Sequence, residues 1–233
     1  WGGIYWGYQV IGQFQSEEEI RNYPVNLDGN NNRTLLPGDF IYKDVNGDGI
    51  INGMDERPIG YPEGWAPIMS FGGNIGLAWK GIDLNIDLSG GAMQGWRQNY
   101  ELANAYHGNG NSPVYLLEDR WHRADLYDPE SEWIPGRYPA IRKGEFSYNN
   151  KNSDFWLHNV RYLRIKNLEV GYSLPAQLLR PIRAQKVRIY ANVSNLCSFD
   201  NVGKFGVDPE ITAAAAVVYP QQRTFLLGFN ITY

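Results

Sequence analysis

Strict alternation of apolar and polar residues is the feature that most constrains this chain. In residues 82–89 the even positions are aliphatic: Ile82, Leu84, Ile86 and Leu88. The positions between them are polar: Asp83, Asn85, Asp87 and Ser89. Successive side chains of a β-strand point to opposite faces, so this period of two predicts a strand with one apolar and one polar face.

The same alternation recurs along the chain and brings the expected number of strands to six. The other segments are residues 4–10, 71–79, 160–174, 186–194 and 224–233. Near the C-terminus the expected apolar face holds Val187, Ile189 and Val193, and then Phe225, Leu227, Phe229 and Ile231, with Asn230 on the polar face. In residues 160–174 the apolar positions change parity near Lys166, which indicates either a bulge or a change of surroundings.

The links between these segments alternate in length. Lys80 and Gly81 alone join the second strand to the third, and residues 175–185 join the fourth to the fifth. The other links are long, at about residues 14–69, 92–159 and 197–222. In an antiparallel meander alternate links lie at the same end. All tight turns therefore fall at one end and all long loops at the other, which is typical of bacterial outer-membrane barrels.

The composition fits an all-β transmembrane barrel segment. No run of 18 apolar residues occurs, which excludes a transmembrane helix. Aromatic residues make up 14% of the chain, as expected where aromatic girdles meet the membrane interfaces. Six strands cannot close a barrel, because the smallest need about eight and the largest plugged transporters have about 22. We therefore expect residues 1–233 to be one part of a larger barrel. Within this part, the residues that face the lumen should include Asp83 and Asn230.

Charge and cysteine content exclude further classes of protein. The formal net charge of -4 gives no electrostatic footprint for nucleic acid. The single cysteine, Cys197, cannot form an internal disulfide. The chain opens at Trp1 without a basic or apolar leader, so we expect a mature or truncated exported protein, and the strand count favours a truncated one.

One segment has the spacing of a calcium-binding loop. Residues 44–55 carry oxygen-bearing groups at loop positions 1, 3, 5, 9 and 12 and Gly49 at position 6. The expected ligands are Asp44, Asn46, Asp48, the backbone carbonyl of Ile50, Asn52 and Asp55. Asp55 stands where calcium loops usually carry Glu. The alternative is an Asp/Asn/Gly-rich turn that binds nothing.

No catalytic constellation is evident, so we expect that the chain is not an enzyme. The three histidines are scattered, and neither a Ser-nucleophile elbow nor a phosphate-binding loop occurs. Acidic pairs such as Glu118 and Asp119 could be read as a glycosidase pair, but such residues are common in surface loops.

Aromatic residues are frequent in the expected loops. Trp65, Trp96, Trp121, Trp133 and Trp156 lie there. Sugar rings stack on exposed aromatic faces, which makes the last four candidate substrate contacts. The alternatives are interfacial girdle residues or rings that form the cores of the loops.

Several motifs occur in a fixed order over nearly the whole chain. They are residues 37–52 (PGDFIYKDVNGDGIIN), 71–74 (FGGN), 81–84 (GIDL), 162–167 (YLRIKN), 171–175 (GYSLP), 195–196 (NL), 207–210 (VDPE) and 219–225 (YPQQRTF). Together they resemble the C-terminal region of the SusC/RagA family of TonB-dependent outer-membrane transporters. Cys197, directly after the NL pair, is a minor departure.

The resemblance implies a 22-stranded barrel with an N-terminal plug, energised through TonB. It implies a SusD-like surface lipoprotein at the external mouth and the import of oligosaccharides or peptides by Bacteroidota. The plug and most of the barrel would lie outside residues 1–233, with the long loops extracellular and the C-terminus periplasmic. Two other readings stay open: a soluble calcium-dependent carbohydrate-binding β-domain, and a glycan-degrading enzyme.

Overall fold

The structure, a computed structural model, describes residues 3–64, 66–142, 146–210 and 221–233. These residues form two compact units. The loop unit comprises the described parts of residues 3–64 and 95–159, and the sheet unit those of residues 66–94 and 160–233. Trp65 of the loop aromatics and residues 219–220 of the YPQQRTF motif lie outside the described residues. Among the described residues no helix is long and apolar enough to cross a membrane.

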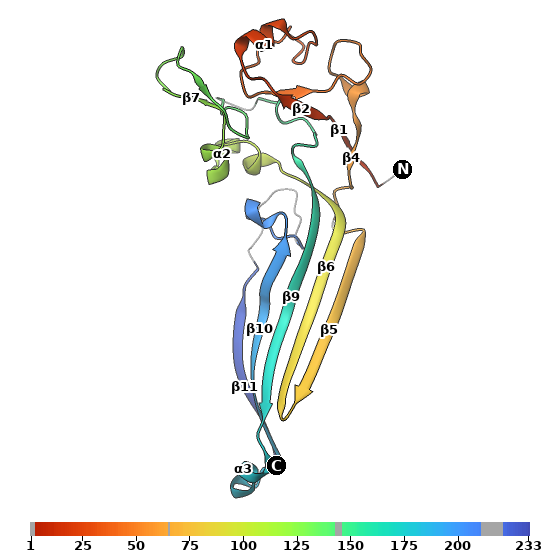
Figure 1. The fold of residues 1–233 in the computed structure, drawn as a ribbon, viewed down its shortest axis with the longest axis vertical. Helices are drawn as coiled ribbons and strands as arrows, with labels where there is room; N and C mark the ends of the chain where they lie inside the picture. The colour runs from red at the N-terminus through yellow and green to blue at the C-terminus, as the bar shows by residue number, and fades with distance from the viewer. Residues whose placement is uncertain (1–2, 65, 143–145, 211–220) are drawn as a thin grey trace. The chain divides into compact units, whose positions relative to one another are not determined.

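The sheet unit is built on a five-stranded sheet in the order β11-β10-β9-β6-β5 (Figure 1). Its strands are β5 (Met69–Trp79), β6 (Ile82–Arg97), β9 (Leu157–Ser173), β10 (Lys186–Asp200) and β11 (Thr224–Thr232). β5 pairs with β6, β9 with β10 and β10 with β11, each antiparallel. The predicted mainly β architecture is confirmed. In the described residues β5 and β11 each have one neighbour, so the sheet is open at both edges.

The predicted tight links occupy one end of the sheet. Lys80 and Gly81 have φ angles of 48° and 86°, the left-handed pair that a two-residue hairpin of type I′ requires. The link after β9 holds α3 (Ala176–Leu179) and η4 (Arg180–Ile182). A hydrogen bond of 2.8 Å from Ser173 N to Gly81 O joins the last residue of β9 to the hairpin link. The other ends of β6, β9, β10 and β11 lie at the opposite end of the sheet.

The predicted strand at residues 4–10 is wrong. Two short strands replace it: β1 (Tyr5–Gly7) pairs with β4 (Arg57–Gly60), and β2 (Val10–Gln13) with β3 (Phe40–Tyr42). Between them the backbone bonds elsewhere, because Tyr8 N donates to Asn152 O at 2.8 Å. The alternation in this segment reflects two separate pairings, and the main sheet has five strands, not six, in the part of the chain that the structure describes.

The change of parity near Lys166 accompanies a bulge in the neighbouring strand. In β10, Asn195 and Leu196 lie opposite Lys166, because Ser194 pairs with Asn167 and Cys197 with Ile165. Two residues opposite one define a β-bulge. Asn195 has a φ of 52°, a left-handed conformation that asparagine tolerates better than most residues.

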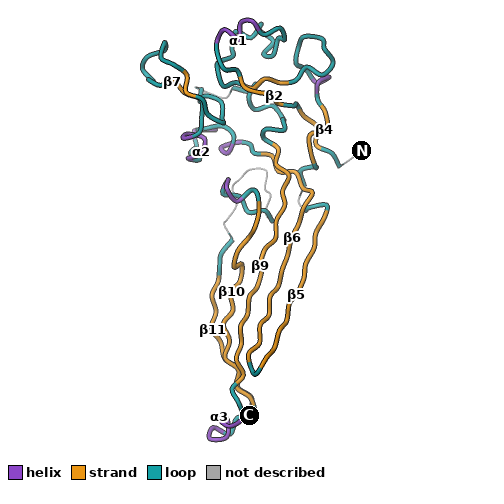
Figure 2. The backbone as a smooth tube through the Cα atoms, in the orientation of Figure 1, coloured by secondary structure: helices purple, strands orange, loops and turns teal. Residues whose placement is uncertain are grey.

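The loop unit is mostly turns and short elements (Figure 2). They include α1 (Glu17–Asn22), η1 (Gly53–Asp55), η2 (Tyr100–Leu102), η3 (His107–Asn109), α2 (Val114–Glu118), β7 (His122–Arg123) and β8 (Trp133–Ile134). In the sheet unit, η5 (Gly203–Phe205) follows β10. Ser16 is the N-cap of α1: its hydroxyl accepts a hydrogen bond from the backbone amide of Glu19, which fixes where the helix begins.

Aromatic rings form the core of the loop unit around β3. Phe40 and Tyr42 are fully buried there, and Trp156 packs against Phe40 with a ring-centroid distance of 5.9 Å. The Tyr42 hydroxyl donates to Tyr148 O at 2.8 Å, and the Tyr148 hydroxyl donates to Phe40 O at 2.5 Å. Burial raises the pKa of both tyrosines, so both stay protonated donors.

A buried ion pair extends this core. Asp39 is 0% exposed and accepts hydrogen bonds from Arg142, from Asn149 Nδ2 at 2.8 Å and from Leu36 N at 2.8 Å. Arg142 also donates to Thr34 O at 2.6 Å. The pair therefore joins segments that are about a hundred residues apart in the sequence.

Candidate functional site: a two-faced sheet and a loop cavity

One face of the sheet is apolar and exposed. Directly paired residues share a face, and the pairs on this face include Ile75 with Ile86 and Ile189 with Phe229. Leu227, opposite Ala191, is 84% exposed. The predicted apolar sets of β6, β10 and β11 all fall on this face: Ile82, Leu84, Ile86, Leu88, Val187, Ile189, Val193, Phe225, Leu227, Phe229 and Ile231. An apolar surface of this extent marks an interaction site with an apolar environment.

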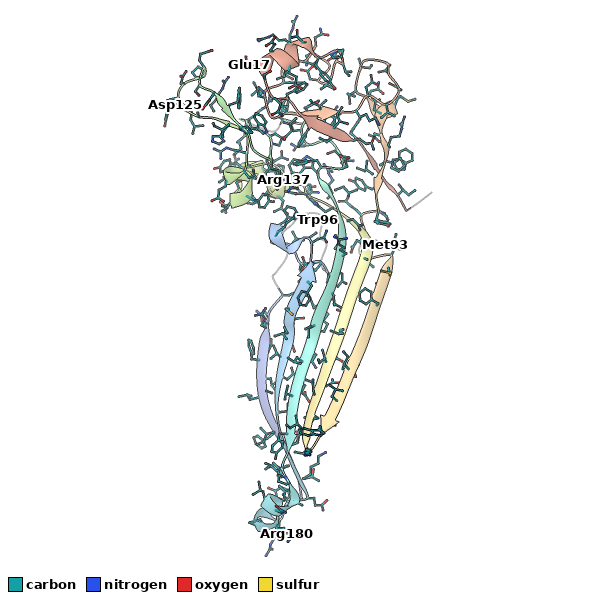
Figure 3. All side chains as sticks on the ribbon, in the orientation of Figure 1. Glu17, Met93, Trp96, Asp125, Arg137 and Arg180 are labelled. Atoms are coloured by element: carbon teal, nitrogen blue, oxygen red, sulfur yellow. The ribbon has the colours of Figure 1, made fainter. Side chains whose placement is uncertain are left out.

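The other face carries a network of amides, carboxylates and a guanidinium. Asn74 Nδ2 donates to Asn85 Oδ1 at 2.8 Å and to Asp87 Oδ1 at 2.7 Å. Asn192 Nδ2 donates to Glu169 Oε2 at 3.3 Å. Asp83, Asn85, Asp87 and Asn230 thus share the polar face, as the alternation predicts. Figure 3 draws the side chains along these strands.

Arg188 is the central cation of the polar face. Its Nε donates to Asp83 Oδ1 at 3.0 Å and its Nη2 to Glu169 Oε1 at 2.7 Å. The guanidinium lies over Gly171 of β9, where an added Cβ would come within 2.3 Å of Nη2. The glycine of the GYSLP motif therefore leaves room for an ion pair that crosses a strand.

The segment after β10 is pinned by a second ionic cluster that sequence reasoning missed. Arg164 donates to Asp208 Oδ2 at 2.6 Å and to Glu210 Oε2 at 3.1 Å, and Lys166 also contacts Glu210 Oε2. Ser89 Oγ donates to Glu210 Oε1 at 2.9 Å. In the sequence, only the VDPE motif pointed to this cluster, and it did not show which cations pair with Asp208 and Glu210.

The predicted calcium loop is closed by hydrogen bonds within itself. Asp44 accepts the amides of Gly47 at 2.7 Å and Gly49 at 2.9 Å. Asp48 accepts the amide of Ile50 at 3.0 Å, and this bond lowers the pKa of Asp48, which keeps its exposed carboxylate ionised. Positive φ angles at Gly47 and Gly49 allow the sharp turns.

Asp55 departs from the expected ligand geometry. It is fully buried, and its two oxygens accept the amides of Val45 and Asn52, each at 2.9 Å. Asn52 in turn caps η1 through the amide of Met54 at 2.8 Å. Among the described residues no group of three His, Cys, Asp or Glu is gathered closely enough to hold a metal. The donor chemistry suits calcium, but the present arrangement is that of a self-bonded loop.

Three of the four candidate indole contacts are core residues. Trp96, Trp121 and Trp156 are 2%, 3% and 1% exposed, and Trp96 stacks on His158 at 5.4 Å. Gly38 packs directly on Trp121, where an added Cβ would be 2.3 Å from the indole. Trp133 is half-buried beneath the guanidinium of Arg123 at 4.4 Å. Trp96 and Trp121 therefore have no free face for a sugar, which corrects that expectation.

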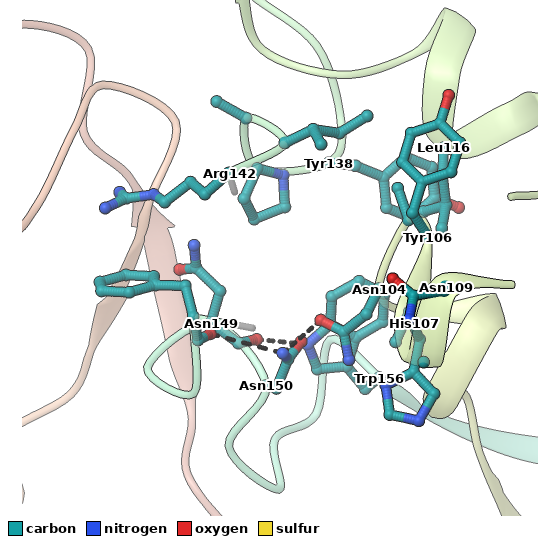
Figure 4. A pocket seen from close by; sticks show the side chains of 17 residues that line it. Asn104, Tyr106, His107, Asn109, Leu116, Tyr138, Arg142, Asn149, Asn150 and Trp156 are labelled. Atoms are coloured by element: carbon teal, nitrogen blue, oxygen red, sulfur yellow. Dashed lines mark hydrogen bonds between the residues drawn. The ribbon is translucent and has the colours of Figure 1, made fainter. Parts of the chain in front are cut away.

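A cavity of about 550 Å³ opens in the loop unit (Figure 4). Its wall comes from the η2–η3 loop, from residues 138–142 and from the turn before β9. Trp156 and Tyr138 border it although both are nearly covered, and Tyr106 is half exposed beside it. Tyr106 and Asn109 hold left-handed φ angles of 60° and 62°, an uncommon conformation that brings their side chains to the wall.

Among the described residues that line this cavity, Arg142 alone carries a formal charge, and His107 adds an imidazole. Asn150 Nδ2 donates to Asn104 Oδ1, which leaves Asn104 Nδ2 and Asn150 Oδ1 without a partner in the described residues. Asn109 is exposed, and its side-chain amide likewise bonds to no described residue. The cavity thus presents amide donors and acceptors beside aromatic rings, the combination that orients an uncharged polar ligand.

Comparison with known proteins relates the chain to a group of receptors. No family model matches it. TonB-dependent receptor P3 of Formosa agariphila is 26% identical over 247 residues, covering 99% of this chain and 22% of the receptor. The chain is a homologue of the TonB-dependent receptors. TonB-dependent receptor SusC of Bacteroides thetaiotaomicron is 33% identical over 99 residues, which is 40% of this chain and 9% of SusC.

Solved structures share the fold of this chain. The RagAB peptide importer in its open-open state matches 99% of this chain and 22% of that chain, with a TM-score of 0.60 and 18% identity. That likeness shows the fold. Nearly the whole chain matches TonB-dependent receptor P3, but it spans only about a fifth of that receptor's length. These relatives are receptors and transporters rather than enzymes.

Proposed function

We propose that this chain is a segment of the wall of a TonB-dependent transporter in the bacterial outer membrane. The observation that carries the proposal is the two-faced sheet, with an exposed apolar face and a hydrogen-bonded polar face. In a membrane barrel the apolar face meets lipid and the polar face lines the lumen. β5 and β11 have 11 and 9 residues, close to the roughly 9–11 residues that cross a bilayer in a tilted strand.

The segment would be the C-terminal part of a plugged barrel of about 22 strands. Short turns are periplasmic and long loops extracellular in such barrels, so the Lys80–Gly81 hairpin would lie at the periplasmic rim. Tyr233 would lie there too, with its ring embedded and its hydroxyl wet. β11 pairs only with β10 in the described residues, which leaves its second edge for a strand outside this chain.

The whole transporter would import oligosaccharides or peptides. A SusD-like lipoprotein would cap its external mouth, and TonB would act through a part of the protein outside this chain. The names of the relatives support this proposal, because they include SusC and the RagAB peptide importer. In this role the segment binds and guides substrate and performs no catalysis.

The loop cavity favours an oligosaccharide over a peptide. Amide groups of Asn104, Asn109 and Asn150 both donate and accept, as sugar hydroxyls require, and Tyr106 offers a half-exposed ring. The described residues that line the cavity supply amides and rings and no carboxylate. Asn104→Ala with Asn109→Ala should slow uptake of the cognate oligosaccharide, whereas Asn111→Ala, just outside the lining, should leave it unchanged. Unchanged uptake by the double variant would rule out this role for the cavity.

We propose further that residues 44–55 bind calcium outside the cell. The ligands would be Asp44, Asn46, Asp48, Ile50 O and Asn52, with Asp55 at the closing position. The support is the loop spacing and the ionised, exposed Asp48. Extracellular modules bind calcium with dissociation constants on the order of 10⁻⁴–10⁻³ M, so a weak site would be occupied there.

The alternative of a soluble calcium-dependent carbohydrate-binding domain leaves the apolar face unexplained. A soluble protein rarely exposes a contiguous apolar patch of more than a few hundred Å². None of the relatives described above is a module of that kind.

Site-directed fluorescence would test the membrane-wall proposal. In the full-length transporter with Cys197→Ser, a bimane label at Leu227→Cys should be quenched by brominated lipid, and a label at Asn230→Cys should not. Equal quenching at both positions, or at neither, would refute the assignment of the two faces.

A further inference from the structure

A groove of about 470 Å³ lies on the apolar face of the sheet unit, at the end opposite the tight links. Its walls include Phe71 of β5, Leu163 of β9 and Phe199 of β10. Phe199 pairs with Leu163, and Phe71 pairs with Gly90, so the three side chains share the apolar face. Phe199 is 64% exposed, and the described residues leave the groove uncovered.

Small residues keep this groove open. An added Cβ at Gly90 would come within 2.2 Å of Cζ of Phe71, so the ring lies flat across the strand where a side chain would stand. The neighbouring Gly91 and Ala92 complete the floor with little more than backbone. A hollow that is apolar at both walls and bare at its floor fits a flexible hydrocarbon chain.

A free cation stands at the rim of the groove. Arg161 is exposed, and its backbone amide donates to Asn201 Oδ1 at 3.0 Å. Its guanidinium forms no hydrogen bond or ion pair within the described part of the chain. Asp200, which also lines the groove, accepts hydrogen bonds from the backbone amides of Val202 at 3.0 Å and of Gly203. The rim therefore presents a guanidinium that has no ion-pair partner among the described residues, while the carboxylate of Asp200 is occupied by backbone amides.

We propose that this groove binds an acyl chain of a phosphorylated outer-leaflet glycolipid of the lipid A type, with a phosphate on Arg161. The inference rests on the membrane-wall function, which puts this strand end at the extracellular leaflet. A guanidinium pairs well with phosphate oxygens, and the apolar walls shield the chain beneath them. A zwitterionic phospholipid lacks the exposed phosphomonoester and would bind less well.

Native mass spectrometry of the full-length transporter, extracted from its own membrane in mild detergent, would test this site. Wild-type protein should retain lipid A, and Arg161→Ala should retain at least about fivefold less. Arg161→Lys should recover part of the retention because it keeps the charge. The matched control is Arg180→Ala in η4, at the other end of the strands, which should retain lipid A like wild type.

Two further variants separate the groove from the charge. Phe199→Ala should reduce retention while Phe225→Ala, on the same face but outside the groove, should not. Equal retention by wild type and Arg161→Ala, or retention of phospholipid in place of lipid A, would overturn the site. Failure of the transporter to require detergent would instead count against the membrane-wall function itself.

Discussion

The guanidinium of Arg188 on β10 reaches Asp83 on β6, two strands away, by passing over Gly171 on β9. Nε and Oδ1 are 3.0 Å apart, and Glu169 takes a second donor at 2.7 Å. One side chain thus ties three strands together on the polar face. The ion pair between Arg188 and Asp83 depends on the absence of a Cβ at residue 171, so a substitution at this residue tests it directly.

Gly171→Ala should destabilise the sheet by displacing this guanidinium. The added methyl would lie 2.3 Å from Nη2, and the flexible arginine would have to give up one or both carboxylates. We expect a loss of roughly 1–3 kcal/mol in the free energy of unfolding, because core overpacking typically costs that much. Urea unfolding in lipid vesicles measures it. Gly73→Ala, where an added Cβ meets nothing within 4 Å, is the matched control.

Arg188→Gln should cost about 1–3 kcal/mol in the same assay. This is less than the roughly 3–5 kcal/mol expected when a fully buried pair is broken, because both carboxylates are partly exposed. Adding Asp83→Asn should recover part of the loss, since it removes one of two facing carboxylates. A double variant as unstable as the sum of both single variants would show that the two residues are not coupled.

A charge on the two faces of β11 should have opposite consequences. Leu227→Arg faces lipid under the proposed function and should cost about 2–4 kcal/mol near the bilayer midplane. Asn230→Arg points to the lumen and should be tolerated within about 1 kcal/mol. Folding yield in vesicles, read by heat-modifiable gel mobility, compares them. The face assignment fails if Asn230→Arg is the more damaging substitution.

Asp39→Asn should open the core of the loop unit. It leaves the guanidinium of Arg142 beside a neutral amide in a buried site, and breaking such a pair costs about 3–5 kcal/mol. Hydrogen exchange should therefore speed up in β3, whose Phe40 amide is held by the neighbouring Asn149. Exchange in β11 should be unchanged. Glu130→Gln, an exposed carboxyl of the same unit, should leave both segments as in wild type.

Calcium removal should loosen residues 44–55 and spare the sheet. Chelation by EGTA should speed hydrogen exchange in this loop, and Asp48→Ala should have the same effect without added chelator. Terbium luminescence, titrated in the full-length protein, should show a site that Asp48→Ala removes and Asp125→Asn keeps. Identical exchange with and without calcium would end the calcium proposal, and the self-bonded loop would then be the complete account.

The sheet was predictable from the sequence because side-chain alternation and tight turns depend on residues that are close together in the chain. The alternation in residues 82–89 fixes which side chains share a face, and Lys80–Gly81 carries the chemistry of a tight hairpin. The same reasoning failed for residues 4–10, where alternation continues across two strands with different partners. A period of two reports extended backbone and does not identify the neighbouring strand.

The loop unit was less predictable because its contacts are long-range. Nothing near Asp39 in the sequence points to Arg142 or Asn149, and nothing near Trp121 shows that Gly38 covers its indole. Aromatic residues in loops suggested open stacking platforms, but such loops need a core of their own and Trp96 and Trp156 supply it. The cavity beside Tyr106 depends on a left-handed backbone conformation, which cannot be predicted from the amino-acid composition.

Within the described residues, β5 and β11 each leave one edge unpaired, which matters for how such a segment would be assembled. A strand edge with free amide and carbonyl groups is a template for any other extended chain, including a second copy of itself. Under the proposed membrane-wall function, these two edges would be safest if they met their neighbours inside the membrane, late and together. A delay in insertion would then expose them to edge-to-edge association in the periplasm, which would favour a chaperone that covers this segment until the barrel closes.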